Sequence, residues 1–475
     1  MAGKLVLIVI DGLTASAFER GIESGRLPTL GRLAELGRYT RAVSAFPSVT
    51  PVCLTTIATG AAQDVHGIPH LSWYSRSERR FVEYGSSLAA MRASGFREAL
   101  RDASVEMSRS HLSSSAVTVF EALEDAGLVT GAINFTCYRG RQEHRIKLPG
   151  VARRNRWYET VLAPSRFFFF NAYESDRTGA PIAVRSRSAG SVDAYAAAVG
   201  RWLVTRDGFD FLVYYLPDYD FASHVSGPDA SSAALERSDA CVARLIEAAG
   251  GVDEFLERYA LVVCADHGQT SVSRIARVEE AFRDLRLLSP RRALAERADI
   301  AVTASNRAAM VYRLAGGKLD TRQLAERLDA TPGADVVLFL EDGEAVARRE
   351  REELRFAPDG SGFRLVGDRD VLDAERYPDG LERVWRALSC DRAGDVIVSA
   401  ADGWEFADLG GRHHAGGGSH GSLLAQDSVV PILSIGISSP GLEERPSIRD
   451  LAPLALGSFG IEPPLSMRRR VALHA

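Results

Sequence analysis

The residues best suited to chemistry are acids that stand directly behind apolar, strand-like runs. Asp11 follows the run Leu5–Ile10, and Asp266 follows Leu261–Ala265 with His267 beside it. Because ligands bind at the carboxyl ends of strands in open parallel sheets, carboxylates at these positions are well placed to bind a cation or a substrate. For Asp11 taken alone, a helix N-cap is an equally good interpretation.

A third acidic segment follows the apolar run Phe211–Leu216. Its Asp220 and His224 are four residues apart, so one helical turn puts both side chains on the same face, where they can share a cation. Asp218, six residues before the histidine, is a rival ligand that fits helical spacing less well. The alternative is an exposed acidic loop in which His224 only caps a helix.

A hydroxyl and a third histidine complete the set. Thr50 and Pro51 open a segment that predicts a helix of about nine residues ending at Gly60, with Thr50 as the N-cap. A hydroxyl there faces free amides and the positive end of the helix dipole, where a phosphate binds, although most threonines before proline only cap a helix. His420 lies in the glycine-rich loop Gly416–Gly421, whose backbone can pass close to a ligand.

Together these segments predict two carboxylate–imidazole sites with one threonine between them. His413 and His414 lie near His420 and could support such a site, but two adjacent loop histidines are more often exposed to solvent. Arg139 and Arg141 are candidates for neutralising a phosphate or a carboxylate of the substrate, with a solvated basic surface as the alternative.

The elements that must position these residues follow an alternating pattern. Short β-branched runs alternate with helical patterns, which predicts an α/β fold with a mainly parallel central sheet flanked by helices on both faces. The predicted core strands are Leu5–Ile10, Val129–Phe135, Phe211–Leu216, Leu261–Ala265, Asp395–Ser399 and Val430–Ile435. The predicted helices are Ser115–Ala126, Val192–Val204, Ser231–Ala249 and one near Ile448–Leu456.

A change in the pattern of predicted strands and helices divides the 475 residues into two parts. Residues 1–300 and 371–475 are predicted to form the catalytic core, and residues 301–370 a small α+β insertion with hairpin-like strands. Within the core, the segment 72–114 is rich in arginine, serine and aromatic residues, and we expect it to fold over the site as a lid.

The composition excludes several classes of protein. Hydrophobic residues at 46% and charged residues at 25% exclude disordered and fibrous chains, and a net charge of −5 offers no overall field for a nucleic-acid polymer. The five scattered cysteines form no CxxC pair, and no apolar run reaches the roughly 18 residues of a membrane span. With no recognisable signal peptide, we expect a cytoplasmic protein that does not associate with a membrane.

The order of these motifs resembles the alkaline phosphatase superfamily, and within it the type I phosphodiesterase/nucleotide pyrophosphatase family. The likeness rests on Asp11, Thr50, Asp220-x-x-x-His224, Asp266-His267 and His420, on Thr59-Gly60 with His66-Gly67-Ile68, and on the C-terminal pattern from Pro446 to Ile461. It covers about residues 1–70, 115–300 and 390–475, and includes neither the insertion nor the lid segment.

The resemblance implies two divalent metal ions, usually zinc, with manganese as the alternative. It implies one metal held by Asp220, His224 and His420, and a second held by Asp11, Asp266 and His267 together with the oxygen of Thr50. It also implies that Thr50 attacks phosphorus to form a covalent phospho- or nucleotidyl-threonine intermediate. His66 matches a family position that is normally structural.

The leading function implied is a phosphodiesterase or nucleotide pyrophosphatase acting on a small-molecule phosphate ester. Where the family has an asparagine three residues after the nucleophile, this chain has Cys53, which cannot hold a phosphoryl oxygen comparably. Phosphomonoesterase, phosphonate hydrolase and phosphomutase activities on the same fold are therefore the alternatives. A non-catalytic metal-binding scaffold is the remote alternative, and the presence of all seven site residues argues against it.

Overall fold

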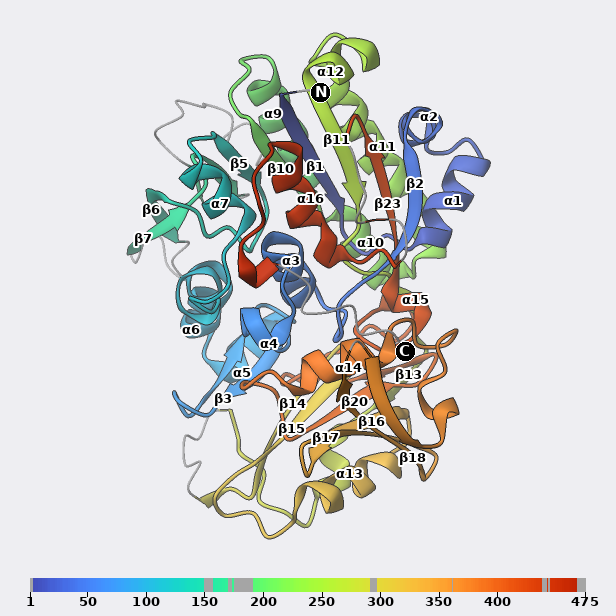
Figure 1. Ribbon diagram of the computed structural model, residues 1–475. Helices are drawn as coiled ribbons and strands as arrows, with labels where there is room; N and C mark the ends of the chain where they lie inside the picture. Colours follow the sequence, from blue (N-terminus) through green and yellow to red (C-terminus); the bar gives the residue numbers. More distant parts are fainter. Residues whose placement is uncertain are drawn as a thin grey trace.

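The most apolar runs of the chain form one eight-stranded sheet in the computed structural model (Figure 1). The structure describes residues 3–148, 157–169, 173–174, 191–290, 297–360, 362–437, 442 and 445–467. The strand order is β2 (Arg38–Val43), β23 (Val429–Ile435), β11 (Tyr259–Cys264), β1 (Lys4–Ile10), β10 (Phe211–Leu216), β5 (Thr130–Ile133), β8 (Arg166–Phe169) and β9 (Tyr173–Glu174). The five central strands from β11 to β8 are parallel, as the alternating sequence pattern predicts.

Two strands depart from the predicted sheet. β23 occupies the predicted run but pairs antiparallel with β11, and β2 continues the sheet beyond it. The run predicted as the core strand Asp395–Ser399 forms β20 (Val396–Ala400), which belongs to a different sheet. A local apolar pattern indicates that a strand forms, but it does not identify the strand's neighbours.

Helices cover both faces of the main sheet (Figure 1). They include α1 (Ala15–Glu23), α2 (Pro28–Leu36), α3 (Thr50–Thr59), α4 (Gln63–His66), α7 (Val119–Asp125), α9 (Val192–Val204), α10 (Asp218–Ser226), α11 (Ser232–Glu247), α12 (Val252–Arg258) and α16 (Leu451–Ser458). α9 has the predicted bounds, whereas α7 and α11 are shorter than predicted at both ends.

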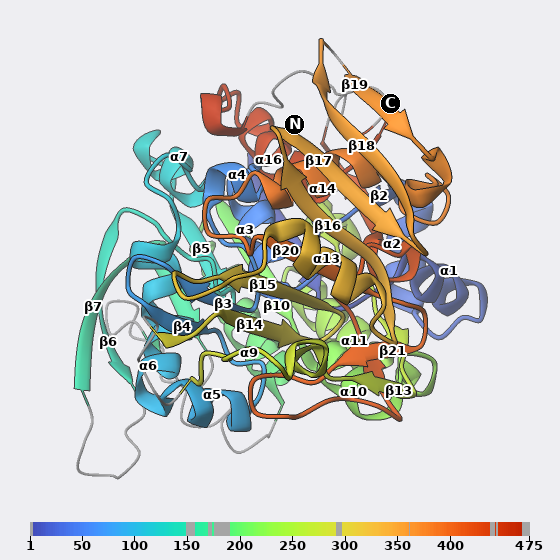
Figure 2. The ribbon, with the colours of Figure 1, turned by 90° about the horizontal axis from the view of Figure 1, so that it is seen from below.

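A second sheet of seven strands lies below the main sheet in Figure 1 and is seen from its outer side in Figure 2. Its order is β14 (Ile300–Ser305), β15 (Ala308–Arg313), β20, β16 (Ala334–Glu341), β17 (Glu344–Arg349), β18 (Glu352–Asp359) and β19 (Gly362–Gly367). α13 (Thr321–Asp329) packs on its outer face, and α14 (Gly380–Leu388) contacts β16 and β17. Because β20 pairs with both β15 and β16, the sheet extends past the predicted insertion boundary at residue 370.

The two sheets share one hydrophobic core. A single cluster of buried residues contains Val6 and Ile8 of the main sheet together with Leu338 and Ile397 of the second sheet. The second sheet has its own smaller cluster on the face that carries α13. The insertion is therefore packed as part of the body rather than as an appended module.

The segment predicted as a lid forms a hairpin and three helices. They are β3 (Ser72–Ser75), β4 (Arg80–Glu83), α5 (Leu88–Ser94), α6 (Phe96–Arg101) and η1 (Asp102–His111). The hairpin packs against β14 of the second sheet, so this segment has its own regular structure and a fixed support.

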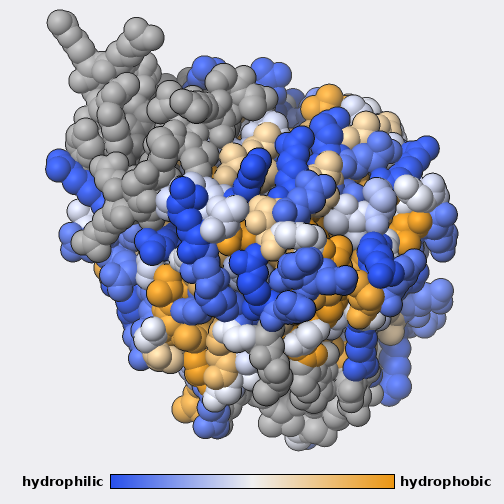
Figure 3. Space-filling model, turned by 90° about the horizontal axis from the view of Figure 1, so that it is seen from above, coloured by the Kyte–Doolittle hydropathy of each residue, from blue (hydrophilic) through white to orange (hydrophobic). Residues whose placement is uncertain are grey.

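The outer surface is mainly polar. The face seen in Figure 3 shows hydrophilic side chains over most of its described surface, interrupted by small apolar groups. Among the described residues, no helix has the length and apolar character needed to cross a membrane.

Candidate functional site

Three buried carboxylates meet at the carboxyl edge of the main sheet. Asp11 directly follows β1, Asp266 lies two residues beyond β11, and Asp220 lies in the first turn of α10, which follows β10. β11, β1 and β10 are adjacent parallel strands, so the three acids converge where the sequence places them. Each of these side chains is at most 5% exposed.

Each of the three predicted histidines is oriented through its Nδ1 atom by a backbone carbonyl. The Nδ1-to-oxygen distances are 2.9 Å from His224 to Gly418, 3.0 Å from His267 to Gly268 and 2.8 Å from His420 to Ser48. A carbonyl oxygen only accepts, so each Nδ1 carries the proton and each Nε2 presents a lone pair. This is the arrangement in which metal-binding histidines are commonly held.

The Nε2 atom of His267 faces two carboxylates as well as the hydroxyl of Thr50. It lies 3.3 Å from Oδ1 of Asp11 and 3.4 Å from Oδ2 of Asp266. Neither carboxylate oxygen has a hydrogen-bond partner in the described structure. Three acceptor atoms converging in a buried place repel one another unless a cation lies among them.

A second group of acceptors centres on Asp220. Nε2 of His224 lies 3.3 Å from its Oδ2, and Nε2 of His420 lies 3.9 Å from its Oδ1. The ligand atoms of Asp220, His224 and His420 all lie within 4.8 Å of one another, as do those of Asp11, Asp220 and His267. Asp220 thus belongs to both groups, whereas the family pattern assigns it to one.

The pKa values of the three acids are shifted in different directions: those of Asp11 and Asp266 are raised and that of Asp220 is lowered. Burial, reinforced by the charges of Asp266 and Asp220, raises the pKa of Asp11 well above its usual range. Burial also raises the pKa of Asp266, with His267 opposing it. Burial alone would raise the pKa of Asp220, but the histidines around it outweigh burial and lower that pKa. Burial and the neighbouring His267 lower the pKa of His420.

Thr50 begins α3 rather than capping it. The N-cap is Val49, Thr50 is the first helical residue, and no side chain caps this helix. The hydroxyl is therefore not used as a cap, and its Oγ1 lies 3.1 Å from Nε2 of His267. Gly60 ends the helix in the left-handed conformation, as predicted. The structure brings all seven predicted site residues into one place.

Three supporting residues were not found by sequence reasoning. The hydroxyl of Tyr215 donates to Oδ2 of Asp11, and Nε2 of Gln269 donates to Oδ1 of Asp220 at 2.6 Å. The side-chain amide of Asn306, in the turn between β14 and β15, lies 2.9 Å from Nε2 of His420. Tyr215 and Gln269 stand close in sequence to ligands, but Asn306 lies in the insertion, where no local signal points to the site.

The other residues considered from the sequence have structural roles or distinct environments. Asp218 accepts hydrogen bonds from Ser191, Val192 and Asp193 at the start of α9, and it belongs to neither group of converging carboxylates and histidines. His413 is exposed. His414 instead stacks on His224, with 4.1 Å between ring centroids, while its Nδ1 lies 2.6 Å from the buried carboxylate of Glu405.

His66, which matches the family pattern, and Cys53, which departs from it, both lie in the core. Burial lowers the pKa of His66 to about 3, and its ring joins α3 to the following turn through Thr56 and Ile68. The thiol of Cys53 is buried 3.2 Å from Oγ of Ser44. Neither side chain lines the cavity at the site.

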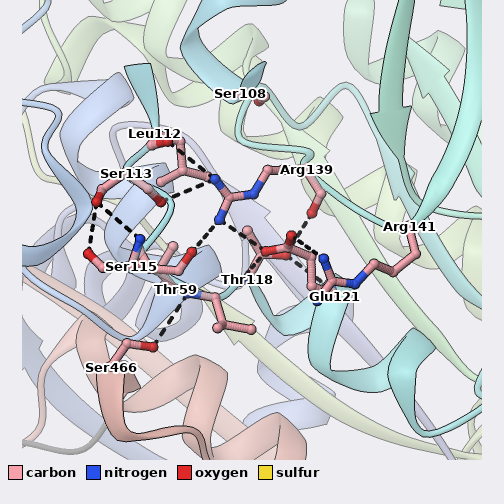
Figure 4. Close-up of polar contacts among 12 residues, drawn as sticks. Thr59, Ser108, Leu112, Ser113, Ser115, Thr118, Glu121, Arg139, Arg141 and Ser466 are labelled. Atoms are coloured by element: carbon pink, nitrogen blue, oxygen red, sulfur yellow. Dashed lines mark hydrogen bonds and ion pairs between the residues drawn. The ribbon is translucent and has the colours of Figure 1, made fainter. Parts of the chain in front are cut away.

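Arg139 and Arg141 both contact the carboxylate of Glu121, and Arg139 also contacts neighbouring backbone carbonyls (Figure 4). Arg139 donates to the backbone carbonyls of Leu112 and Ser113 and to the carboxylate of Glu121. Arg141 pairs with Glu121 and Asp125. Neither lines the cavity, and both guanidinium groups instead join the loop after β5 to α7.

A cavity of about 650 Å³ opens onto Thr50 and onto four of the site residues, Asp11, Asp220, His224 and His420. The segment predicted as a lid supplies part of its wall through Tyr84, Ser86 and Met107. Asn134, Phe169 and α10 supply other parts. A volume of this size suits a small-molecule ligand.

Comparisons with known proteins agree with this geometry. The family model for type I phosphodiesterase/nucleotide pyrophosphatase matches residues 5–423. This match runs through the lid segment and the insertion, both of which the motif-based likeness leaves out. A search of curated proteins gives no match.

The fold is shared with several solved structures. Phosphonoacetate hydrolase from Sinorhizobium meliloti 1021, solved with phosphonoformate, is 18% identical with a TM-score of 0.59, over 96% of this chain and 95% of that chain. Murine ectonucleotide pyrophosphatase/phosphodiesterase 5 is 13% identical with a TM-score of 0.60, over 97% and 96%. The human counterpart is 14% identical with a TM-score of 0.58, over 97% and 96%.

At such low identities the solved structures show the fold alone, while the family model covers most of the chain. The α/β architecture, the converging acids and histidines, and this match lead to one conclusion. The protein belongs to the type I phosphodiesterase/nucleotide pyrophosphatase family of the alkaline phosphatase superfamily, and it is a phosphoester-hydrolysing enzyme.

Proposed function

We propose that the protein is a two-metal-dependent phosphodiesterase of small-molecule esters that acts through a covalent intermediate on Thr50. The observation that carries the proposal is that lone pairs of imidazole nitrogens and carboxylate oxygens face one another in a buried place. Three Nε2 atoms with their protons held on Nδ1 converge on carboxylate oxygens, two of which accept no hydrogen bond in the described structure. Imidazole and carboxylate donors of this kind fit zinc, with manganese as the second choice.

The residues divide between two cations. Asp220, His224 and His420 would hold one, and Asp11, Asp266, His267 and the hydroxyl of Thr50 would hold the other. Asp220, which is close to both groups, would lie between them. When bound, the cations would lower the pKa of a coordinated hydroxyl and neutralise negative charge on the phosphoryl oxygens.

The chain's own residues then account for the reaction. The Thr50 hydroxyl loses its proton and attacks phosphorus, the Oγ–P bond forms, and the bond to the leaving alcohol breaks as that oxygen gains a proton. Water subsequently attacks the phosphorus of the phospho- or nucleotidyl-threonine, and Thr50 regains its proton. The free amino end of α3, which no side chain caps, adds a positive dipole beside the phosphoryl group.

The test compares bis-p-nitrophenyl phosphate with p-nitrophenyl phosphate, each with zinc and with manganese. We expect faster hydrolysis of the diester, and a loss of at least about a thousandfold in Thr50→Ala because the nucleophile is absent. Thr50→Ser is the matched control, since it keeps the hydroxyl and should retain measurable activity.

A covalent adduct gives an independent readout. Rapid acid quench followed by mass spectrometry should find the phosphoryl adduct on a peptide containing Thr50. An adduct of the same mass in Thr50→Ala, or faster hydrolysis of the monoester than of the diester, would contradict the proposal.

A further inference from the structure

We propose that the exposed apolar face of α10, formed by Phe221 and Val225, binds the leaving alcohol of the substrate, and that this alcohol is uncharged and apolar. The inference rests on the proposed function and specifies its substrate class: a phosphodiester whose only negative charge is the phosphoryl group.

The first observation is the exposure of two apolar side chains at the site. Phe221 is 54% exposed and Val225 is 78% exposed, although nearly all large apolar side chains near the main sheet are buried. Both line the cavity. They are four residues apart on one helix, so they share a face, and each directly follows a predicted ligand, Asp220 or His224.

The second observation places this face relative to Thr50. The Thr50 hydroxyl lies against His267, whereas Phe221 and Val225 flank the group around His224. In an in-line displacement the leaving oxygen lies opposite the attacking oxygen. A leaving group that departs on the His224 side therefore emerges beside Phe221 and Val225.

The third observation is the charge of the cavity wall. Its described lining contains no lysine or arginine; its polar members outside the metal site are neutral groups such as Asn134, Ser86 and Thr136. Most of the remaining wall is apolar, including Leu71, Tyr84, Met107, Phe169 and Val192. A carboxylate or second phosphate on the leaving group would lose its hydration there without gaining a cationic side chain from the described part of the wall.

The helix also fixes these side chains in place. Asp220 and His224 are held by hydrogen bonds to Gln269 and to the Gly418 carbonyl, so the intervening face of α10 cannot rotate away from the cavity. An apolar leaving group would cover apolar surface that is otherwise in water, which strengthens its binding in proportion to the area covered.

The experiment uses two methyl aryl phosphates with nitrophenol leaving groups of matched pKa, one neutral and one bearing a ring carboxylate. We expect kcat/KM for the neutral ester to exceed that for the carboxylate ester by about tenfold or more. Phe221→Ala and Val225→Ala should each lower kcat/KM for the neutral ester by roughly fivefold, mainly through KM, and change the carboxylate ester by less than about twofold.

Matched variants separate this effect from general damage. Phe221→Leu keeps an apolar side chain and should retain most of the preference. Val366→Ala removes an apolar side chain that is as exposed as Phe221 but lies on β19 of the second sheet. It should leave kcat/KM unchanged for both esters.

The outcomes distinguish the two proposals. Equal or faster hydrolysis of the carboxylate ester, or equal losses for both esters in the α10 variants, would overturn the inference and leave the phosphodiesterase assignment standing. No hydrolysis of either ester with zinc or manganese would overturn the proposed function and this inference with it.

Discussion

Asp220 shows how one side chain can belong to two groups of candidate metal ligands at once. Its oxygens lie within reach of His224 and His420 on one side and of Asp11 and His267 on the other. Asp266, by contrast, contacts only His267 among the histidines of the site. The two aspartates look equivalent in the sequence, since each follows an apolar strand. In the structure Asp220 is close to both groups, whereas Asp266 is close to one.

This difference predicts different metal contents. Asp266→Asn should lose about one metal per chain because only the group at His267 loses a charge, while Asp220→Asn should lose metal from both groups. Elemental analysis after gel filtration, with wild type and Thr50→Ser as references, measures this directly. Equal metal retention in the two aspartate variants would show that Asp220 serves one group only.

At the scale of elements, the loops that carry His267 and His420 are joined by a buried ion pair. Arg307 and Asp427 are both fully buried and lie 2.7 Å apart. The backbone N–H of Arg307 donates to the carbonyl of His420, and the carbonyl of Asp427 accepts from Gly268, which follows His267. Arg307 follows Asn306 in the β14–β15 turn, so the second sheet supports both histidine loops through this pair.

We expect Arg307→Met to weaken metal retention as well as the fold. Removing one partner of a buried pair leaves an unpaired charge and costs about 3–5 kcal/mol of unfolding free energy. Because the histidine loops also lose their support, competition with a chelator should remove metal at least several times faster than from wild type. Arg386→Met is the control, since Arg386 pairs with Asp64 at 2.8 Å, is largely buried and joins elements other than the two loops.

Equal rates of metal loss in both arginine variants would mean that the Arg307 pair acts on stability alone. The rate of metal loss separates support of the histidine loops from general stability, because Arg386 joins α14 to α4, outside the site.

The elements also show how far sequence reasoning reaches. β1, β10 and β11 are predictable because each is a continuous apolar run followed by chemistry-bearing residues. β20 has the same local pattern but pairs in the second sheet, because strand pairing depends on long-range packing that no single run encodes. The position of Asn306 at the site could not be predicted for the same reason: only the tertiary fold brings the β14–β15 turn beside His420.

Across the whole molecule, the shared core of the two sheets implies that they unfold together. One buried cluster joins residues of both sheets, so separating the sheets would expose apolar surface on each. A buried group in the β3–β4 hairpin, which packs against β14 of the second sheet, should therefore affect the stability of the entire chain. Glu83, at the end of β4, is such a group, with an Oε1 that accepts from the backbone N–H groups of Gly85 and Ser86.

Glu83 predicts a defined pH dependence of stability. Burial raises its pKa from 4.5 to about 7, against the hydrogen bonds from Ser86. Between these two values the unfolded chain releases the proton while the folded chain retains it, so the unfolding free energy falls as pH rises and levels off above about pH 7. Glu83→Gln keeps the acceptor and cannot ionise. In urea titrations the Glu83→Gln variant should match wild type at pH 4 and exceed it by up to about 3 kcal/mol at pH 8, and parallel curves for the two proteins would contradict the assignment.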